Sequence, residues 1–359
     1  MTQPTTDIRP CRRSPTLKAK ALRHRRISNR QATKKMKRLY IIGNGFDLHH
    51  GLRTGYYDFA QYLEKSNNEL FSTLEKYISY PANQNSLWSD FEANLANLGI
   101  DEILDDNTIY LPDIMSDEFR DRDLHAFPDV MDNFFRLLTE ELYQEFQDFI
   151  QLVEVPESAY SKMIEIDIQA TFLTFNYTNT LEKIYGIKRN KVTYIHNSAF
   201  YGVEPIVLGH GINPENFKQK TPEPPDNLET EDYGRWYDEN VSWDYSFDTG
   251  RETLEKYFET TFKPTEKVIK DKQYFLQVIN QFDEINIFGH SLSDVDMHYF
   301  REIYKHSNKD AYWRVSYYSL NNKKHYFEKM TNLGVNSSKL DLFELKDIQR
   351  NNKQLKLEL

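Results

Sequence analysis

Four short segments of the chain place amide, hydroxyl, imidazole or carboxyl side chains directly after a run of apolar residues. The first is Gly43-Asn44-Gly45-Phe46-Asp47, which follows the apolar run 39–42. Two glycines after a strand let the backbone turn tightly and bring free N–H groups close to a pyrophosphate. A nicotinamide-dehydrogenase fingerprint has a third glycine at position 48, where this chain has Leu48. The segment therefore predicts either a phosphate-binding loop of another kind or a structural turn.

A polar cluster continues from this loop and consists of Asp47, His49, His50 and Arg53. The position of the cluster favours a binding role for the loop over a purely structural turn. Adjacent histidines point in different directions on any regular element, so His49 and His50 do not predict a two-histidine metal site. We expect no metal.

The second segment is the apolar run 170–175, which leads directly into Asn176, Tyr177 and Thr178. The carboxyl ends of parallel strands form the ligand-binding edge of an open α/β sheet, so we expect Asn176 at that edge. Its side chain carries both a donor and an acceptor, which suits the positioning of a water or a ribose hydroxyl. The structural alternative is that this stretch caps the next helix, with Thr178 or Asn179 as the N-cap.

The remaining two segments repeat the pattern with histidines. His196 ends the run 192–195, and His210 follows the run 206–208 in Leu208-Gly209-His210-Gly211. The fourth segment is Gly289-His290-Ser291-Leu292-Ser293-Asp294, after the run 285–288. Ser291 and the loop amides suit a phosphate or a ribose, whereas Ser293 or Asp294 capping the next helix is the structural alternative. A single histidine at a strand end is usually structural, but four such segments in one parallel sheet predict a shared site.

These segments require a parallel sheet that brings their strand ends together. Strands are predicted at 37–42, 170–175, 192–195, 206–208, 285–288, 313–318 and 340–345, with helices at about 178–185, 294–304 and 323–333. Amphipathic helices are predicted at 56–64, 68–79 and 87–98, and an apolar stripe from Met131 to Phe149 predicts a long helix beginning at Pro128. The pattern predicts an α/β fold with an open, mainly parallel, Rossmann-like sheet, helices on both faces and a helical insertion at about 56–153.

Charge and composition divide the chain unevenly. Residues 1–35 carry eleven Lys or Arg and one acid, which leaves 34 basic and 54 acidic residues in 36–359, a net charge of −20. We expect 1–35 to be a disordered extension; a nucleic-acid-binding arm, a transit-like segment and a mis-set translation start at Met1 instead of Met36 remain open. The acidic remainder, a single domain, makes nucleic acid an unlikely partner. Residues 214–240, rich in acids and prolines, predict a lid or a plain surface loop.

The remaining features exclude several classes of protein. The single cysteine, Cys11, has no partner for a disulfide or a cysteine metal site, which favours a reducing, cytoplasmic environment. No apolar run is long enough to span a bilayer, and no secretory signal is visible at the N-terminus. The chain has no Gly-x-Ser-x-Gly, no Gly-Lys-Ser/Thr and no His-Glu-x-x-His motif.

Taken in order, the motifs resemble the AbiH family of bacteriophage abortive infection proteins. The resemblance covers Met36 to about Tyr304 and rests on the following segments: 43–47, Gly51-Leu52-Arg53-Thr54-Gly55-Tyr56, Trp88-Ser89-Asp90-Phe91-Glu92, 174–182 and 289–296. AbiH-like proteins in turn resemble sirtuin-type NAD-binding domains. That second resemblance implies that Gly43 and Gly45 hold the pyrophosphate, that Asn176 and His196 are catalytic, and that Gly289, Ser291 and Leu292 bind the adenosine ribose. Thr174, at the same strand end as Asn176, is expected to help bind the nucleotide.

Two departures from the sirtuin pattern concern the chemistry. Asn197 follows His196 where a glycine is expected, and Thr178 stands where sirtuin-like defence enzymes often have an aspartate. The resemblance implies a phage-defence protein that binds NAD or a related nucleotide, and hydrolyses it to nicotinamide and ADP-ribose. The alternatives are a nucleotide-binding sensor that does not hydrolyse its ligand and a nucleic-acid-directed effector. A phage-derived trigger and a homo-oligomer are further expectations.

Overall fold

A computed structural model of the protein describes residues 1–2, 36–218, 223–225, 228–240 and 244–350. Residues Lys37–Leu359 form one compact unit, and Met1–Met36 form a second unit. The predicted basic extension, 1–35, therefore lies almost entirely outside the described residues. The fold below concerns the larger unit alone.

The larger unit contains a six-stranded sheet in which every described pairing is parallel. The strands run in the spatial order β3-β2-β1-β4-β5-β6, so the predicted α/β fold with an open parallel sheet is confirmed. The chain reverses its direction of travel across the sheet between β1 and β4, and this is where open α/β sheets bind ligands. The strands are β1 (Arg38–Ile42), β2 (Thr171–Thr174), β3 (Val192–Tyr194), β4 (Glu284–Phe288), β5 (Tyr312–Tyr317) and β6 (Leu340–Glu344).

The register aligns the carboxyl ends of the central strands. Ile42, the last residue of β1, pairs with Thr174 of β2 on one side and with Phe288 of β4 on the other. The loops that follow these three strands therefore begin at the same level. This alignment brings three of the four polar segments to one edge of the sheet.

Both faces of the sheet are covered by helices, which explains why its strands are nearly continuous apolar runs. Leu39 and Ile41 point into a core shared with α13, α14, α15 and α16, and Tyr40 and Ile42 into a core shared with α2, α9 and α10. The helices are α2 (Asn44–His49), α9 (Ser158–Ser161), α10 (Thr180–Tyr185), α13 (Thr265–Asp271), α14 (Gln273–Leu276), α15 (Met297–His306) and α16 (Leu320–Leu333).

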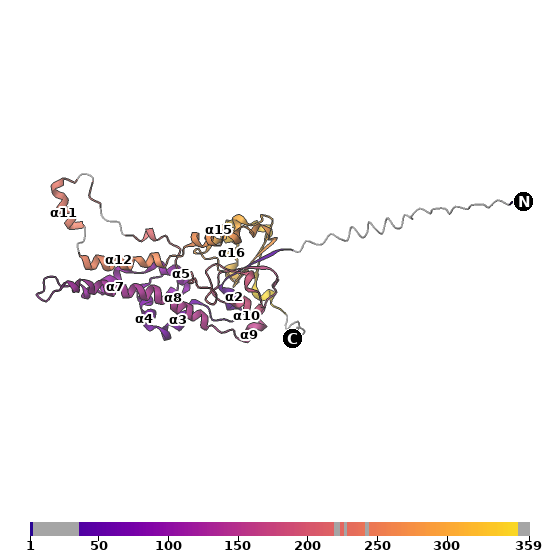
Figure 1. The fold of residues 1–359 in the computed structure, drawn as a ribbon, viewed down its shortest axis with the longest axis horizontal. Coiled ribbons are helices and arrows are strands. Elements are labelled where there is room, and N and C mark those ends of the chain that lie inside the picture. The colour runs from indigo at the N-terminus through magenta and orange to yellow at the C-terminus, as the bar shows by residue number, and fades with distance from the viewer. Residues whose placement is uncertain (3–35, 219–222, 226–227, 241–243, 351–359) are drawn as a thin grey trace. The chain divides into compact units, whose positions relative to one another are not determined.

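A third core belongs to a helical region built mainly from residues 56–152. The predicted stripe forms α7 and α8, joined by a π-helical turn, Leu137–Glu141, and α12 packs along α7 (Figure 1). The predicted helix 87–98 is divided into short turns around Phe91–Asn94. The helices are α3 (Tyr56–Ser66), α4 (Asn68–Tyr77), α5 (Phe91–Asn94), α6 (Ile100–Asp106), α7 (Ala126–Arg136), α8 (Leu142–Leu152), α11 (Thr230–Asn240) and α12 (Tyr245–Thr260).

One predicted strand is wrong. Residues 206–208 do not pair with the sheet; Ile206 and Leu208 are buried in the helical core instead. The N–H of Val207 donates to the carbonyl of His196, so this segment still lies beside the end of β3. A run of three apolar residues is buried equally well against a helical core as in a sheet, so periodicity alone does not separate the two.

Candidate functional site

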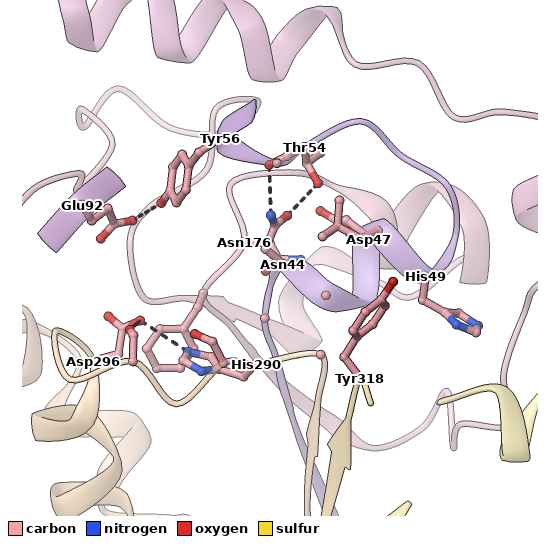
Figure 2. A pocket seen from close by; sticks show the side chains of 18 of the residues that line it. Asn44, Asp47, His49, Thr54, Tyr56, Glu92, Asn176, His290, Asp296 and Tyr318 are labelled. Atoms are coloured by element: carbon pink, nitrogen blue, oxygen red, sulfur yellow. Dashed lines mark hydrogen bonds and ion pairs between the residues drawn. The ribbon is translucent and has the colours of Figure 1, made fainter. Parts of the chain in front are cut away.

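A cavity of about 1180 Å³ lies at the carboxyl ends of the central strands. Its lining comes from the loops after β1, β2, β3 and β4 and from the helical region, including Tyr56, Trp88 and Glu92. Figure 2 shows Asn44, Asp47 and Thr54 on one side of this cavity, with Glu92, His290 and Asp296 on another. The cavity is therefore shared between the sheet edge and the helical insertion.

The structure brings most of the residues with predicted site roles to this cavity. Those that line it are Gly43, Asn44, Gly45, Asp47, Asn176, His196, Gly289, His290, Ser291 and Asp294. Their binding and catalytic roles stay predictions.

Four of the residues with predicted site roles do not line the cavity: Phe46, Thr174, His210 and Leu292. Leu292 is fully buried in the core shared with α13 to α16. Phe46 is fully buried in the core on one face of the sheet. The Oγ1 of Thr174 accepts a hydrogen bond from the N–H of Asn176 at 3.1 Å. Thr174 therefore holds the backbone at the end of β2. His210 is buried among Phe217, Phe258 and Phe262.

The glycines of the first and fourth segments lock two loops together. The N–H of Gly45 donates to the carbonyl of Gly289 at 2.7 Å, and the N–H of Phe46 donates to that of Gly43 at 2.9 Å. A Cβ on Gly289, which has a φ of +68°, would lie 2.0 Å from the nitrogen of Phe46. Close loop packing therefore requires glycine here, and the N–H groups of Gly45 and Phe46 already have partners and are not free for a phosphate.

The side chain of Asn44 also serves the loop. Its Nδ2 donates to the carbonyl of Thr54 at 3.0 Å, and its Oδ1 accepts from the Thr54 hydroxyl at 2.6 Å. These two bonds tie the first segment to the stretch that enters α3. The Asn44 amide is thus satisfied within the protein.

The side-chain amide of Asn176, unlike that of Asn44, has no hydrogen-bond partner among the described residues. The residue is 6% exposed, and neither Nδ2 nor Oδ1 has a partner in hydrogen-bond geometry among the described residues. A buried amide normally has partners, because leaving it without them costs about 1–3 kcal/mol. Asn176 is also one of the residues that line the cavity.

Asp47 lies beside Asn176 and is fully buried. Its Oδ2 accepts a hydrogen bond from the Thr178 hydroxyl at 2.6 Å, whereas its Oδ1 has no partner among the described residues. Burial raises the pKa of Asp47 from 3.8 to about 6, against the lowering effect of the Thr178 and Thr180 hydroxyls and the Asn176 amide. The carboxyl group therefore titrates close to neutral pH.

A paired set of charges forms the other side of the cavity. Lys263, which follows α12 and is fully buried, donates from Nζ to Asp296 Oδ1 at 3.2 Å and also to Glu92 Oε2. Tyr56 donates its hydroxyl to Glu92 Oε1 at 2.5 Å (Figure 2). Burial would raise the pKa of Asp296, but Lys263, His196 and His290 together lower it to about 2. These groups link the helical region to the loop after β4.

Two histidines face Asp296. His290 accepts from the N–H of Leu292 through Nδ1 at 2.9 Å, so in the neutral ring the proton is on Nε2, 3.5 Å from Asp296 Oδ2. Burial lowers the pKa of His290 to about 4. His196 has Nε2 3.7 Å from Asp296 Oδ1 and without a hydrogen-bond partner among the described residues. Burial and the neighbouring Lys263 charge hold the pKa of His196 well below 6.5, so both rings are neutral at pH 7.

The adjacent histidines of the first segment have separate partners. His50 is held by the carbonyl of Phe46 and the hydroxyl of Tyr185, each at 2.7 Å. His49 Nε2 lies 3.0 Å from the carbonyl of Lys162, on a different element. The two rings are thus directed to different parts of the protein, and His50 packs as a core residue.

Sequence reasoning missed the paired charges. Glu92 and Asp296 stand in segments that carry the family resemblance, but neither received a site role there. Lys263 has no local signal, because a single lysine between Phe262 and Pro264 looks like any surface residue. Only the burial of two carboxylates around one point shows that a cation is needed at that position.

A comparison with protein families identifies one match. The model of the family described as bacteriophage abortive infection AbiH matches residues 39–317, more than half of the chain. No curated protein and no solved structure matches the chain. Among the described residues, no helix combines the length and the apolar character that crossing a membrane requires. The predicted AbiH resemblance is confirmed, and the resemblance to sirtuin-type domains stays a prediction.

Proposed function

The chain belongs to the AbiH family of bacteriophage abortive infection proteins, and we propose that it binds NAD or a related nucleotide in the cavity and hydrolyses it to nicotinamide and ADP-ribose. Family membership supports a role in abortive infection. The ligand and the reaction are the proposal, and the cavity at the β1–β4 reversal of the sheet is where such a fold binds a nucleotide.

The observation that carries the proposal is the free amide of Asn176. Both of its polar atoms are buried and lack a partner among the described residues, and the residue lines the cavity. A water or ribose hydroxyl placed there would satisfy a donor and an acceptor at once. Such placement of a water against the reacting carbon is the main requirement of a hydrolysis whose leaving group needs no protonation.

The charges of the cavity suit the cationic end of NAD. The carboxyl groups of Asp47, Glu92 and Asp296 lie around its interior, with Lys263 as a partner for two of them. The nicotinamide ring is cationic before cleavage, and the ribose becomes cationic in the transition state. Negative charge near both is favourable in a low-dielectric site. Lys329, held by the carbonyl of Leu292 and by Asp294, offers a cation to the phosphates.

His196 is better suited to binding than to proton transfer. The backbone of Phe175 hydrogen-bonds its ring, and because Nε2 is the ring nitrogen without a partner, Nδ1 is the donor in that bond. Nε2 is then an acceptor in the neutral ring, suited to a ribose hydroxyl. The depressed pKa of His196 makes it a weak base.

The direct test is to incubate the purified full chain with NAD and to measure free nicotinamide by chromatography. We expect release by the wild-type protein and a loss of at least about 100-fold in Asn176→Ala. ADP-ribose binding, measured by calorimetry, shows whether the cavity of each protein is intact. Binding of NAD without release would support the non-hydrolytic sensor instead, and neither binding nor release would exclude both. Activity that requires phage infection of the host cell would point to a phage-derived trigger.

A further inference from the structure

We infer that Asp47 is the general base of the proposed hydrolysis and takes the proton of the attacking water on its Oδ1. This inference rests on the proposed function and adds a catalytic residue to it. The sequence places Asp47 among the residues that bind the nucleotide, with no part in the chemistry.

The geometry of the Asp47 carboxyl supports this role. Thr178 holds Oδ2 at 2.6 Å, which leaves Oδ1 as the oxygen that is buried and unpartnered within the described chain. The Asn176 amide lies beside the same carboxyl group. A water held there would accept from Asn176 Nδ2 and donate to Asp47 Oδ1.

The other candidate bases of the cavity are less suitable. Glu92 and Asp296 both accept a hydrogen bond from Lys263. One oxygen of each carboxylate is therefore already bonded, and the lysine compensates their charge. His196 and His290 are neutral rings of low basicity, and both face Asp296. The side chain of Asp294 is 95% exposed and pairs with Lys329. Among the described residues of this cavity, Asp47 is the buried carboxyl group with no cation beside it.

The groups around Asp47 explain its basicity. Thr178, Thr180 and Asn176, which reach it from the segment after β2, are uncharged. On its own helix, His49 and His50 follow it; both have pKa values lowered by burial, and Lys162 lies near them. The pKa of Asp47, about 6, makes the carboxylate both present at neutral pH and more basic than an ordinary aspartate.

The proposed step is balanced as follows. The bond between C1′ of the ribose and the ring nitrogen breaks, and its electron pair stays on the nitrogen, so nicotinamide leaves as a neutral molecule. The water oxygen forms the new bond to C1′, and the water proton goes to Asp47 Oδ1. The neutral carboxylic acid then releases this proton to solvent. The anionic carboxylate also opposes the positive charge that develops on the ribose.

Asp47→Asn tests this role, because it keeps the shape of the side chain and the acceptor for Thr178. We expect kcat for nicotinamide release to fall by at least about 100-fold, with Kd for ADP-ribose changed less than about threefold. In the wild-type protein, kcat/KM should fall about tenfold for each pH unit below pH 6, since protonated Asp47 accepts no proton. The matched control is Asp310→Asn, an exposed carboxylate outside the cavity, which should behave as the wild type.

The outcomes separate the two proposals. A wild-type protein that releases nicotinamide, together with an Asp47→Asn variant of unchanged kcat and unchanged pH profile, overturns the role of Asp47 and leaves the proposed function standing. A wild-type protein that binds ADP-ribose but releases no nicotinamide, either alone or with extract of phage-infected cells, overturns both. A variant that loses activity together with ADP-ribose binding contradicts a role in proton transfer, because it assigns Asp47 to binding alone.

Discussion

The cavity contains two buried acidic corners that differ in how their charge is compensated. In the corner formed by the helical region and the loop after β4, Glu92 and Asp296 share the fully buried Lys263. In the corner formed by the loops after β1 and β2, Asp47 has a hydroxyl as its partner, and the neighbouring Asn176 has none among the described residues. Both corners lie at one edge of the same sheet.

The difference separates what holds the protein together from what a ligand uses. A buried ion set with its partners in place links two parts of the fold, and removing one member leaves an uncompensated charge. A buried amide and a buried carboxyl oxygen without partners lower the stability of the folded protein. Such groups are retained where they have another use, which makes the Asp47–Asn176 corner the better candidate for the chemistry.

Removing Lys263, the cation shared by Glu92 and Asp296, should have the largest effect on the free energy of unfolding. Lys263→Met leaves Glu92 and Asp296 buried and uncompensated, so we expect a loss of about 3–5 kcal/mol in the free energy of unfolding, measured in urea at pH 7.5. The loss should be smaller at pH 5, where protonation of the carboxyl groups relieves their repulsion. Adding Glu92→Gln to Lys263→Met should recover part of the loss. A loss below about 1 kcal/mol would show that this corner does not hold the helical region to the sheet.

Removing the charge of Asp47, in the corner formed by the loops after β1 and β2, should increase the stability of the protein. The folded-state pKa of Asp47 is raised from 3.8 to about 6, so ionisation weakens the folded state as pH rises through this interval. Asp47→Asn should therefore stabilise the protein by up to ~3 kcal/mol above pH 7 and by little at pH 4. Thermal unfolding from pH 4 to pH 8, with Asp310→Asn as the control, measures this difference. A variant less stable than wild type at pH 8 would mean that the Asp47 charge is compensated after all.

Two buried asparagines provide the next comparison. Asn94 is 1% exposed, and its Nδ2 donates to the carbonyl of Leu87 at 2.9 Å, whereas the Asn176 amide has no such partner. Asn94→Ala should reduce the free energy of unfolding by about 1–3 kcal/mol, because it leaves that carbonyl unpaired. Asn176→Ala should change it by less than about 1 kcal/mol while abolishing nicotinamide release. Equal losses of stability would show that Asn176 also has a structural partner.

The smallest expected effect concerns the hydroxyl that holds Asp47. The hydrogen bond from Thr178 lowers the pKa of Asp47, so Thr178→Val should raise that pKa further and move the acid limb of the pH–rate profile upward by less than about one unit. Thr178→Ser keeps the hydroxyl and should restore the wild-type profile. If the Val variant has an unchanged profile, the limb belongs to a group other than Asp47.

The sheet and its ligand edge could be predicted because their signals are local. The strands β1, β2, β4, β5 and β6 are short apolar runs flanked by glycine or polar residues, and such runs carry their own periodicity. Asn176 follows one of these runs directly and Asp47 lies in the segment after another, so their positions at the edge followed from the parallel arrangement. The failed strand at 206–208 has the same local signal, but contacts from the helical region decide its structure.

The parts of the site that depend on distant contacts could not be predicted. Lys263 and Glu92 are 171 positions apart, and no feature near either residue indicates that they meet. The sequence also does not show that the Asn44 amide is hydrogen-bonded whereas the Asn176 amide lacks a partner among the described residues, because both residues follow a strand. Hydrogen-bond partners and burial are properties of the assembled fold.

The contacts between the loops after β1 and β4 determine when the cavity can form during synthesis of the chain. Arg38 of β1 pairs with Glu284 of β4, 246 positions later in the chain. At a synthesis rate of about 5–20 residues per second, roughly 12 to 50 s pass on the ribosome before the first strand meets this neighbour. Until then the N–H of Gly45 cannot bond to the carbonyl of Gly289. The edge of β1 that pairs with β4 is also exposed to chaperones. A nascent or prematurely terminated chain that ends before residue 289 therefore carries the first catalytic candidates but no finished cavity.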